Sequence, residues 1–192
     1  MTNNQVLHIR HKTTGKILHS VNADTLRGAN LRGVDLRRAN LRGANLINSD
    51  LQDADSRRAN LTNADLIDAN LKNANLKNAN LENADLRDAD LRDVDLEDAN
   101  LRGANLERAT LKDANLKDAN LEGANLSRAN LERATLKDAT LRGANLEDAD
   151  LEDANLIDAD LQDANLIGAN LIHATLKDCL LYTSDAADDA MN

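Results

Sequence analysis

The sequence predicts an all-β solenoid, a chain wound into stacked coils, and three observations support this fold class. A leucine recurs every five residues from Leu26 to Leu176, and 30 of the 31 positions in this register are leucine, with Ser56 the exception. A small residue, usually alanine, stands two positions before nearly every leucine, and Asn, Asp or Thr lies between them. Seven of the eight glycines fall two residues after a leucine. Self-similarity at a fixed period is the signature of a repeat architecture.

The five-residue period excludes one regular helix or one long strand. In a helix, leucines five apart would differ by about 140° and would spread around the whole cylinder. In a strand, they would point alternately to opposite faces. A chain that bends at every unit buries all of them, because the alanine and the leucine two residues later share a face.

The other positions of each unit predict corners. The Asn, Asp or Thr before each leucine points outward or bonds to nearby backbone, as short polar side chains do at turns. The two residues after each leucine are strongly polar and turn the corner. Glycines such as Gly28 and Gly33 in this phase indicate unusual backbone angles there.

The tandem pattern Ala-(Asp/Asn)-Leu-X-X, seen in Ala29-Asn30-Leu31 and Ala104-Asn105-Leu106, resembles the pentapeptide-repeat family. The resemblance covers residues 24–178. It implies a right-handed quadrilateral β-helix with four units in each coil, so the 31 units give about seven to eight coils.

Residues 1–23 predict a β-hairpin that caps the first coil. Two short apolar stretches, 6–11 and 17–21, flank a turn that contains Gly15. A solenoid end exposes strand edges and core, and it needs such a cover. The histidines at positions 8, 11 and 19 are interpreted as ordinary cap residues and not as metal ligands, because the first two differ in strand parity.

Residues 179–192 predict an irregular tail. From Cys179 through Asp188 they resemble the in-frame translation of a transposon-type sequencing adapter, so we expect an artefact of read assembly. If the tail is native, Cys179 and Leu181 continue the alanine and leucine positions for one more unit. Cys179 is the only cysteine, and an internal disulfide is therefore impossible.

Charge divides the chain into a basic start and an acidic remainder. Residues 1–60 carry a net charge of +5 and residues 61–192 carry −15, which gives −10 overall. Either end is a candidate protein-binding surface. The arginines of the basic end are a candidate anion site, for phosphate or an acidic partner, and the alternative for both ends is an ordinary solvated face. The basic candidates, one 20-residue coil apart, are Arg37, Arg38, Arg57 and Arg58. The acidic candidates are Glu147, Asp148, Asp150, Glu152, Asp153, Asp158, Asp160 and Asp163.

The sequence favours no catalytic or cofactor site. It has no Gly-rich phosphate loop, no Cys/His metal spacing and no nucleophile beside an orienting base. Negative charge and the lack of stacking aromatics disfavour direct nucleic-acid binding. Without a signal region or a membrane-length apolar stretch, the protein is expected in the cytoplasm, away from membranes.

The leading hypothesis is a non-enzymatic scaffold that presents charged faces to a protein partner. The alternative is implied by the resemblance: some pentapeptide-repeat proteins mimic duplex DNA and bind bacterial type II topoisomerases, such as DNA gyrase. This chain departs from that pattern in its basic first coils, its mixed surface and the lack of an evident C-terminal dimer element. The opposite charges of the two ends also suggest a homodimer or head-to-tail association.

Overall fold

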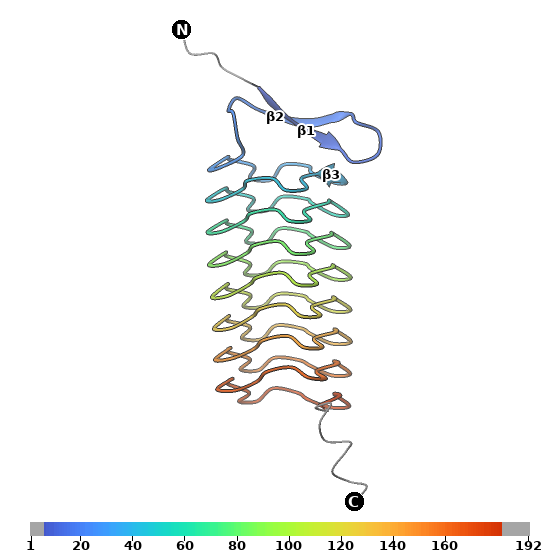
Figure 1. Cartoon of the computed structure of the whole chain (residues 1–192), viewed down its shortest axis with the longest axis vertical. Helices are drawn as coiled ribbons and strands as arrows, with labels where there is room; N and C mark the ends of the chain where they lie inside the picture. The colour runs from blue at the N-terminus through green and yellow to red at the C-terminus, as the bar shows by residue number, and fades with distance from the viewer. Residues whose placement is uncertain (1–5, 182–192) are drawn as a thin grey trace, which may run out of the picture.

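The computed structural model describes residues 6–181, which form a rod of stacked coils with a hairpin across its first end (Figure 1). Parallel bridges join residues 20 positions apart, as in Asn60–Asn80 and Asn80–Asn100, so each coil contains four five-residue units. Each unit forms one side of the coil. The described residues contain strands and no helix, in agreement with the all-β quadrilateral β-helix of about seven to eight coils.

In interior units with Asn or Asp before the leucine, all five backbone N–H groups are hydrogen-bonded, which explains why the five-residue pattern folds this way. Three of the five N–H groups donate to carbonyl oxygens of the neighbouring coils, and one closes a turn within the unit. The fifth donates to the side-chain oxygen of the Asn or Asp that precedes the leucine. In one unit, the N–H groups of Leu71, Asn73 and Asn75 donate to the carbonyl oxygens of Asp90 (2.7 Å), Arg92 (3.0 Å) and Ala54 (2.9 Å). The Ala74 N–H donates to the Leu71 carbonyl oxygen at 2.9 Å, and the Lys72 N–H donates to Asn70 Oδ1 at 3.1 Å.

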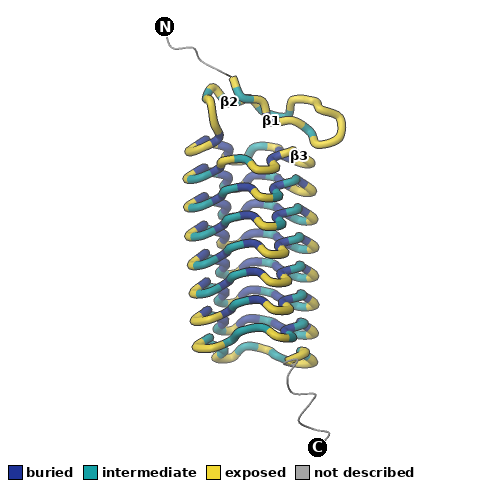
Figure 2. Tube along the Cα trace, viewed as in Figure 1, coloured by how far each residue is buried: buried dark blue, intermediate teal, exposed yellow. Residues whose placement is uncertain are grey.

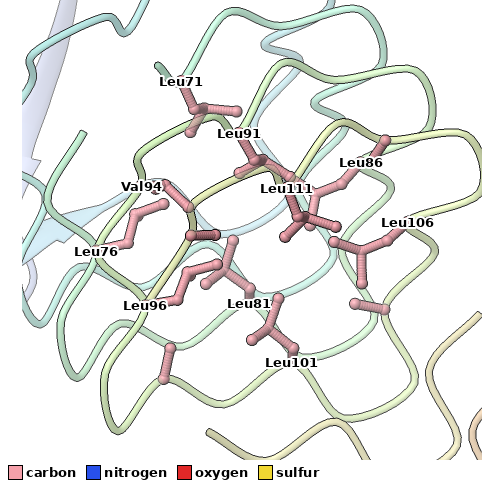
Figure 3. Close-up of a cluster of buried hydrophobic side chains, with 14 of the residues drawn as sticks. Leu71, Leu76, Leu81, Leu86, Leu91, Val94, Leu96, Leu101, Leu106 and Leu111 are labelled. Atoms are coloured by element: carbon pink, nitrogen blue, oxygen red, sulfur yellow. The ribbon is translucent and has the colours of Figure 1, made fainter. Parts of the chain in front are cut away.

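The core is a ladder of leucine and alanine that runs along the rod axis. Interior residues such as Leu66, Leu86 and Ala104 are fully buried, and the buried positions form continuous lines through the stacked coils (Figure 2). In the close-up the leucine side chains converge on the axis, and Val94 fills one alanine position (Figure 3). Burial of each leucine contributes about 2 kcal/mol, before the cost of ordering the chain is subtracted.

The corners use left-handed backbone, as the phase of the glycines predicts. Every unit from Leu26 to Leu176 has positive φ at the second residue after the leucine, whether that residue is glycine or not. Gly103 has a φ of +64°, and at Asn78 the angle is +60°. Asn and Asp at this position therefore indicate the corner as well as glycine does, since both also tolerate left-handed backbone.

The hairpin consists of β1 (Leu7–His11) and β2 (Ile17–Val21), which pair antiparallel. The opposite edge of β1 pairs with β3 (Ala39–Asn40) of the first coil, so the sheet order is β2-β1-β3. Ile9 is buried and joins the leucine core. The predicted hairpin cap is thus present, and it is fixed to the β-helix by strand pairing.

The last coil is less buried than those before it. Leu161 is the last leucine with a buried side chain, and Ile167 and Ile172 are 74% and 56% exposed. The repeat hydrogen bonds nevertheless continue to Leu180, whose N–H donates to the Ala159 carbonyl oxygen at 3.1 Å. Cys179 occupies the alanine position of that unit. Residues 182–192, which make up most of the expected tail and include Tyr182, lie outside the described residues.

Candidate interaction surfaces

The four candidate arginines lie together at one corner of the first two full coils. Arg37 and Arg38 follow Leu36, and Arg57 and Arg58 occupy the same two positions one coil later. The Arg38 N–H donates to the carbonyl oxygen of Arg57 at 2.9 Å, so the two pairs are in direct register. All four side chains belong to exposed residues.

Two of these arginines fold back onto carboxylates of their own corner. Arg37 Nε lies 2.8 Å from Asp35 Oδ1, and Arg57 Nε lies 2.8 Å from Asp55 Oδ1. The Arg37 guanidinium, which donates hydrogen bonds to the carboxylate of Asp35, lowers the pKa of Asp35 to about 2. Arg57 likewise lowers the pKa of Asp55. These two arginines are therefore largely neutralised, and the corner keeps less free charge than its sequence suggests.

A groove of about 710 Å³ opens between this corner and the hairpin. The hairpin contributes His11, Lys16 and Leu18, and the β-helix contributes side chains from three successive coils. From the β-helix come Asp35, Arg37, Arg38, Arg57, Arg58, Lys77 and Asn78. Sequence reasoning did not assign His11, Lys16 and Lys77 to this surface, because nothing in the repeat pattern says over which corner the hairpin lies. The 20-residue coil alone could have added Lys77.

The acidic candidates do not form one cluster. Asp148, Asp153, Asp158 and Asp163 occupy the left-handed turns of four successive units, with φ between 55° and 59°. Because four units complete one coil, these carboxylates lie at four different corners and ring the rod. Glu147 and Glu152 precede two of these aspartates directly and share their corners.

Asp150 and Asp160 have a structural role in their turns. Their side-chain oxygens accept the N–H groups of Glu152 and Gln162 at 3.2 and 3.1 Å. Asp150 also accepts a hydrogen bond of 2.9 Å from Asn170 one coil later. Both aspartates are half-buried, so they contribute less to the outer surface than the corner aspartates do.

The remaining sequence features have ordinary environments. Ser56 lies inward and is buried in the leucine ladder. His8 Nδ1 lies 2.9 Å from the Ser20 hydroxyl, and the described residues contain no group of three or more His, Cys, Asp or Glu side chains arranged for a metal ion. Between residues 6 and 181 no helix is long and apolar enough to cross a membrane.

Comparisons with known proteins agree with this architecture. The sequence model described as pentapeptide repeats (8 copies) matches residues 25–55, 57–93, 89–128, 114–153 and 144–181. Among the curated proteins, none matches the chain.

Several solved structures are similar to the chain. HetL, a pentapeptide repeat protein involved in heterocyst differentiation regulation in the cyanobacterium Nostoc sp. strain PCC 7120, is 34% identical; the match covers 79% of this chain and 84% of HetL, with a TM-score of 0.39. A trypsin-treated variant of QnrB1, a plasmid-mediated fluoroquinolone resistance protein, is 16% identical over 86% of this chain and 87% of that one, with a TM-score of 0.56. A pentapeptide repeat protein of the Arabidopsis thaliana thylakoid lumen is 34% identical over 56% and 72%, with a TM-score of 0.43.

Proposed function

Since this chain belongs to the pentapeptide-repeat family, we propose that it is a non-enzymatic scaffold of the cytoplasm that binds a protein partner through its charged faces. The observation that carries this proposal is the division of charge along the axis, with +5 in residues 1–60 and −15 in residues 61–192. In a solenoid the order of the coils is the order of the chain, so a charge division in the sequence becomes a charge division in space.

Such a surface suits a partner that is oriented by electrostatics. Complementary charge accelerates encounter and fixes the direction of docking more than it adds affinity. The four corner aspartates of the acidic coil, Asp148, Asp153, Asp158 and Asp163, project at every side of the rod. A partner can therefore recognise the acidic end from several directions, while the basic end offers a single grooved corner.

Affinity capture at low salt with stepwise salt elution tests this proposal. The full chain is the bait, and a variant with Asp148→Asn, Asp153→Asn, Asp158→Asn and Asp163→Asn is compared with it. Asn suits the left-handed turn, so the variant keeps its fold. We expect a specific protein that elutes from the wild type as salt rises and is retained less by the variant.

A matched control distinguishes the location of the removed charges from their number. Asp68, Asp93, Asp98 and Asp118 also occupy left-handed turns, but in the middle coils. Their joint replacement by Asn removes the same charge and should leave capture unchanged. Capture that survives the acidic-coil variant, or that falls equally in both variants, contradicts binding through the acidic end.

The second candidate is a DNA mimic that binds a bacterial type II topoisomerase. It is favoured by the ring of carboxylates around the acidic coil and by the net charge of −10. Purified DNA gyrase tests it directly: the full chain should reduce supercoiling, and the acidic-coil variant should lose this effect while the middle-coil control keeps it. Unchanged supercoiling at a large excess of the chain excludes this candidate.

A further inference from the structure

Five arginines, among them Arg38 and Arg58, occupy left-handed turns at which the sequence otherwise favours short side chains. Of the 24 non-glycine residues with positive φ between positions 6 and 181, 18 are Asn or Asp and five are arginine. Left-handed backbone costs a longer L-residue about 1–2 kcal/mol, whereas Asn and Asp adopt it more readily. An arginine at such a turn is therefore expected to make an interaction that offsets the cost of its backbone conformation.

Three of the five arginines have that compensation, and two do not. The ion pairs, each with a carboxylate one coil away, are Arg108–Asp88 at 2.7 Å, Arg133–Asp113 at 2.6 Å and Arg128–Asp148 at 3.8 Å. Arg38 and Arg58, with φ of 56° and 58°, form no ion pair within residues 6–181. Both side chains line the groove beneath the hairpin. Backbone strain at two arginines that have no ion pair to offset it, and whose side chains line a groove, indicates a ligand in that groove.

The rest of the groove supplies further donors for an anion. Its only carboxylate is Asp35, against six cationic side chains. Three of the six already pair with carboxylates, Arg37 with Asp35, Arg57 with Asp55 and Lys77 with Glu97. The other three, Lys16, Arg38 and Arg58, form no ion pair within residues 6–181. His11 Nδ1 accepts the N–H groups of Thr13 and Thr14 at 3.2 and 3.1 Å. In the neutral ring the hydrogen therefore resides on Nε2, which is a donor.

We propose that this groove binds an oligophosphate, a compact ligand of two or more linked phosphoryl groups. Adjacent coils stack at about 4.8 Å, so the guanidinium forks of Arg38 and Arg58 can engage different oxygens of one phosphoryl group. A terminal phosphoryl group presents three acceptor oxygens to such forks, whereas a carboxylate presents two. The volume of about 710 Å³ exceeds what a single phosphate fills and lies in the ~300–1,000 Å³ range of small-molecule sites. No Phe, Tyr or Trp side chain lines the groove, and its lining is mainly cationic.

The capture experiment alters the acidic coil, whereas this inference concerns the basic groove, so either can fail without the other. Calorimetry tests the inference with pyrophosphate as the probe. In about 50 mM NaCl, where screening is moderate, the full chain should bind pyrophosphate saturably at one site. The double variant Arg38→Asn/Arg58→Asn should weaken this binding by about ten-fold or more, because two charge-assisted contacts are lost. Since Asn is easier to hold in these turns, the ligand-free variant should melt at the same temperature as the wild type or higher.

Two comparisons make the test specific. The control Arg27→Asn/Arg42→Asn removes the same charge from the first coils, outside the groove, and should keep the wild-type affinity. Citrate, which offers several carboxylates, should bind more weakly than pyrophosphate. The proposal is overturned if pyrophosphate gives no saturable heat, if the two double variants lose affinity equally, or if citrate binds as tightly as pyrophosphate.

Discussion

The Asn or Asp that precedes most leucines accepts a hydrogen bond from the one N–H of the unit that no carbonyl oxygen accepts. Asn120 is an example, because its side-chain oxygen accepts the N–H of Glu122 at 3.0 Å. Asparagines at this position also bond to one another along the rod, as Asn100 Nδ2 does to Asn80 Oδ1 at 3.1 Å. Asn and Asp are thus frequent before the leucines because their side chains accept a backbone hydrogen bond, and not only because this position faces solvent.

Replacing Asn120 by alanine should lower the free energy of unfolding by about 1 kcal/mol, because the Glu122 N–H loses its acceptor. Asn120→Asp keeps an oxygen at the same place and should cost clearly less. Urea denaturation followed by circular dichroism measures both changes. Equal losses in the two variants would show that the side-chain acceptor does not matter.

The sequence predicted residue positions well and residue partners poorly. The five-residue period assigns Leu86 to the core and Asp88 to a corner without further information. It does not say that Asp88 binds Arg108, because that pairing depends on which rotamers two long side chains adopt across neighbouring coils. The groove escaped prediction for a related reason: His11 and Lys16 reach it through the β1–β3 pairing, which has no signature in the repeat.

At the scale of one ladder, Ser56 interrupts a column of leucines. It is buried between Leu36 and Leu76, which hold the same position in the adjacent coils. The backbone of this site is the one that carries leucine at all the other positions of the register. A leucine side chain should therefore fit at position 56 without a change of the corner.

Ser56→Leu should raise the free energy of unfolding by up to about 2 kcal/mol through added apolar burial. The opposite change one coil later, Leu76→Ser, should lower it by about 2–5 kcal/mol. Thermal melting of both variants gives the comparison. A lower melting temperature for Ser56→Leu would mean that the neighbouring side chains have already closed over the site.

The middle coils contain short ion pairs within single corners, and these predict an acid response. Arg87 and Arg92 donate hydrogen bonds to Asp85 and Asp90 and thereby lower the pKa of each carboxyl. A carboxyl whose pKa is lower in the folded chain stabilises the fold above its unfolded pKa of about 3.9. This contribution is lost as the pH falls through the folded pKa.

The melting temperature of the wild type should consequently fall more steeply below about pH 4 than that of the double variant Asp85→Asn/Asp90→Asn. The variant keeps the side-chain oxygens that the turns use, but it has no carboxylate to protonate. Circular dichroism melts between neutral and strongly acidic pH measure the difference. Parallel acid profiles would show that these exposed pairs add nothing to stability.

At the scale of the whole molecule, the opposite charges of the two ends of the rod predict attraction between copies. The basic corner lies under the hairpin, and the acidic coil rings the opposite end. We expect the apparent mass in light scattering to rise above 20.9 kDa at low salt and to return to it when the Debye length shortens at about 1 M salt. A mass that stays at the monomer value at all salt concentrations contradicts head-to-tail association.

In this uniform coil, the distance between two sites along the rod axis and the angle between them around that axis can be changed separately. Removing 20 residues from the middle of the rod deletes one complete coil, so the ends approach by about 4.8 Å and keep their azimuth. Removing five residues turns everything beyond the cut by a quarter of a revolution, because each unit is one side of the coil. Insertions and deletions in multiples of five thus set the angle between the groove and the acidic coil. Only multiples of 20 change their distance and leave that angle intact.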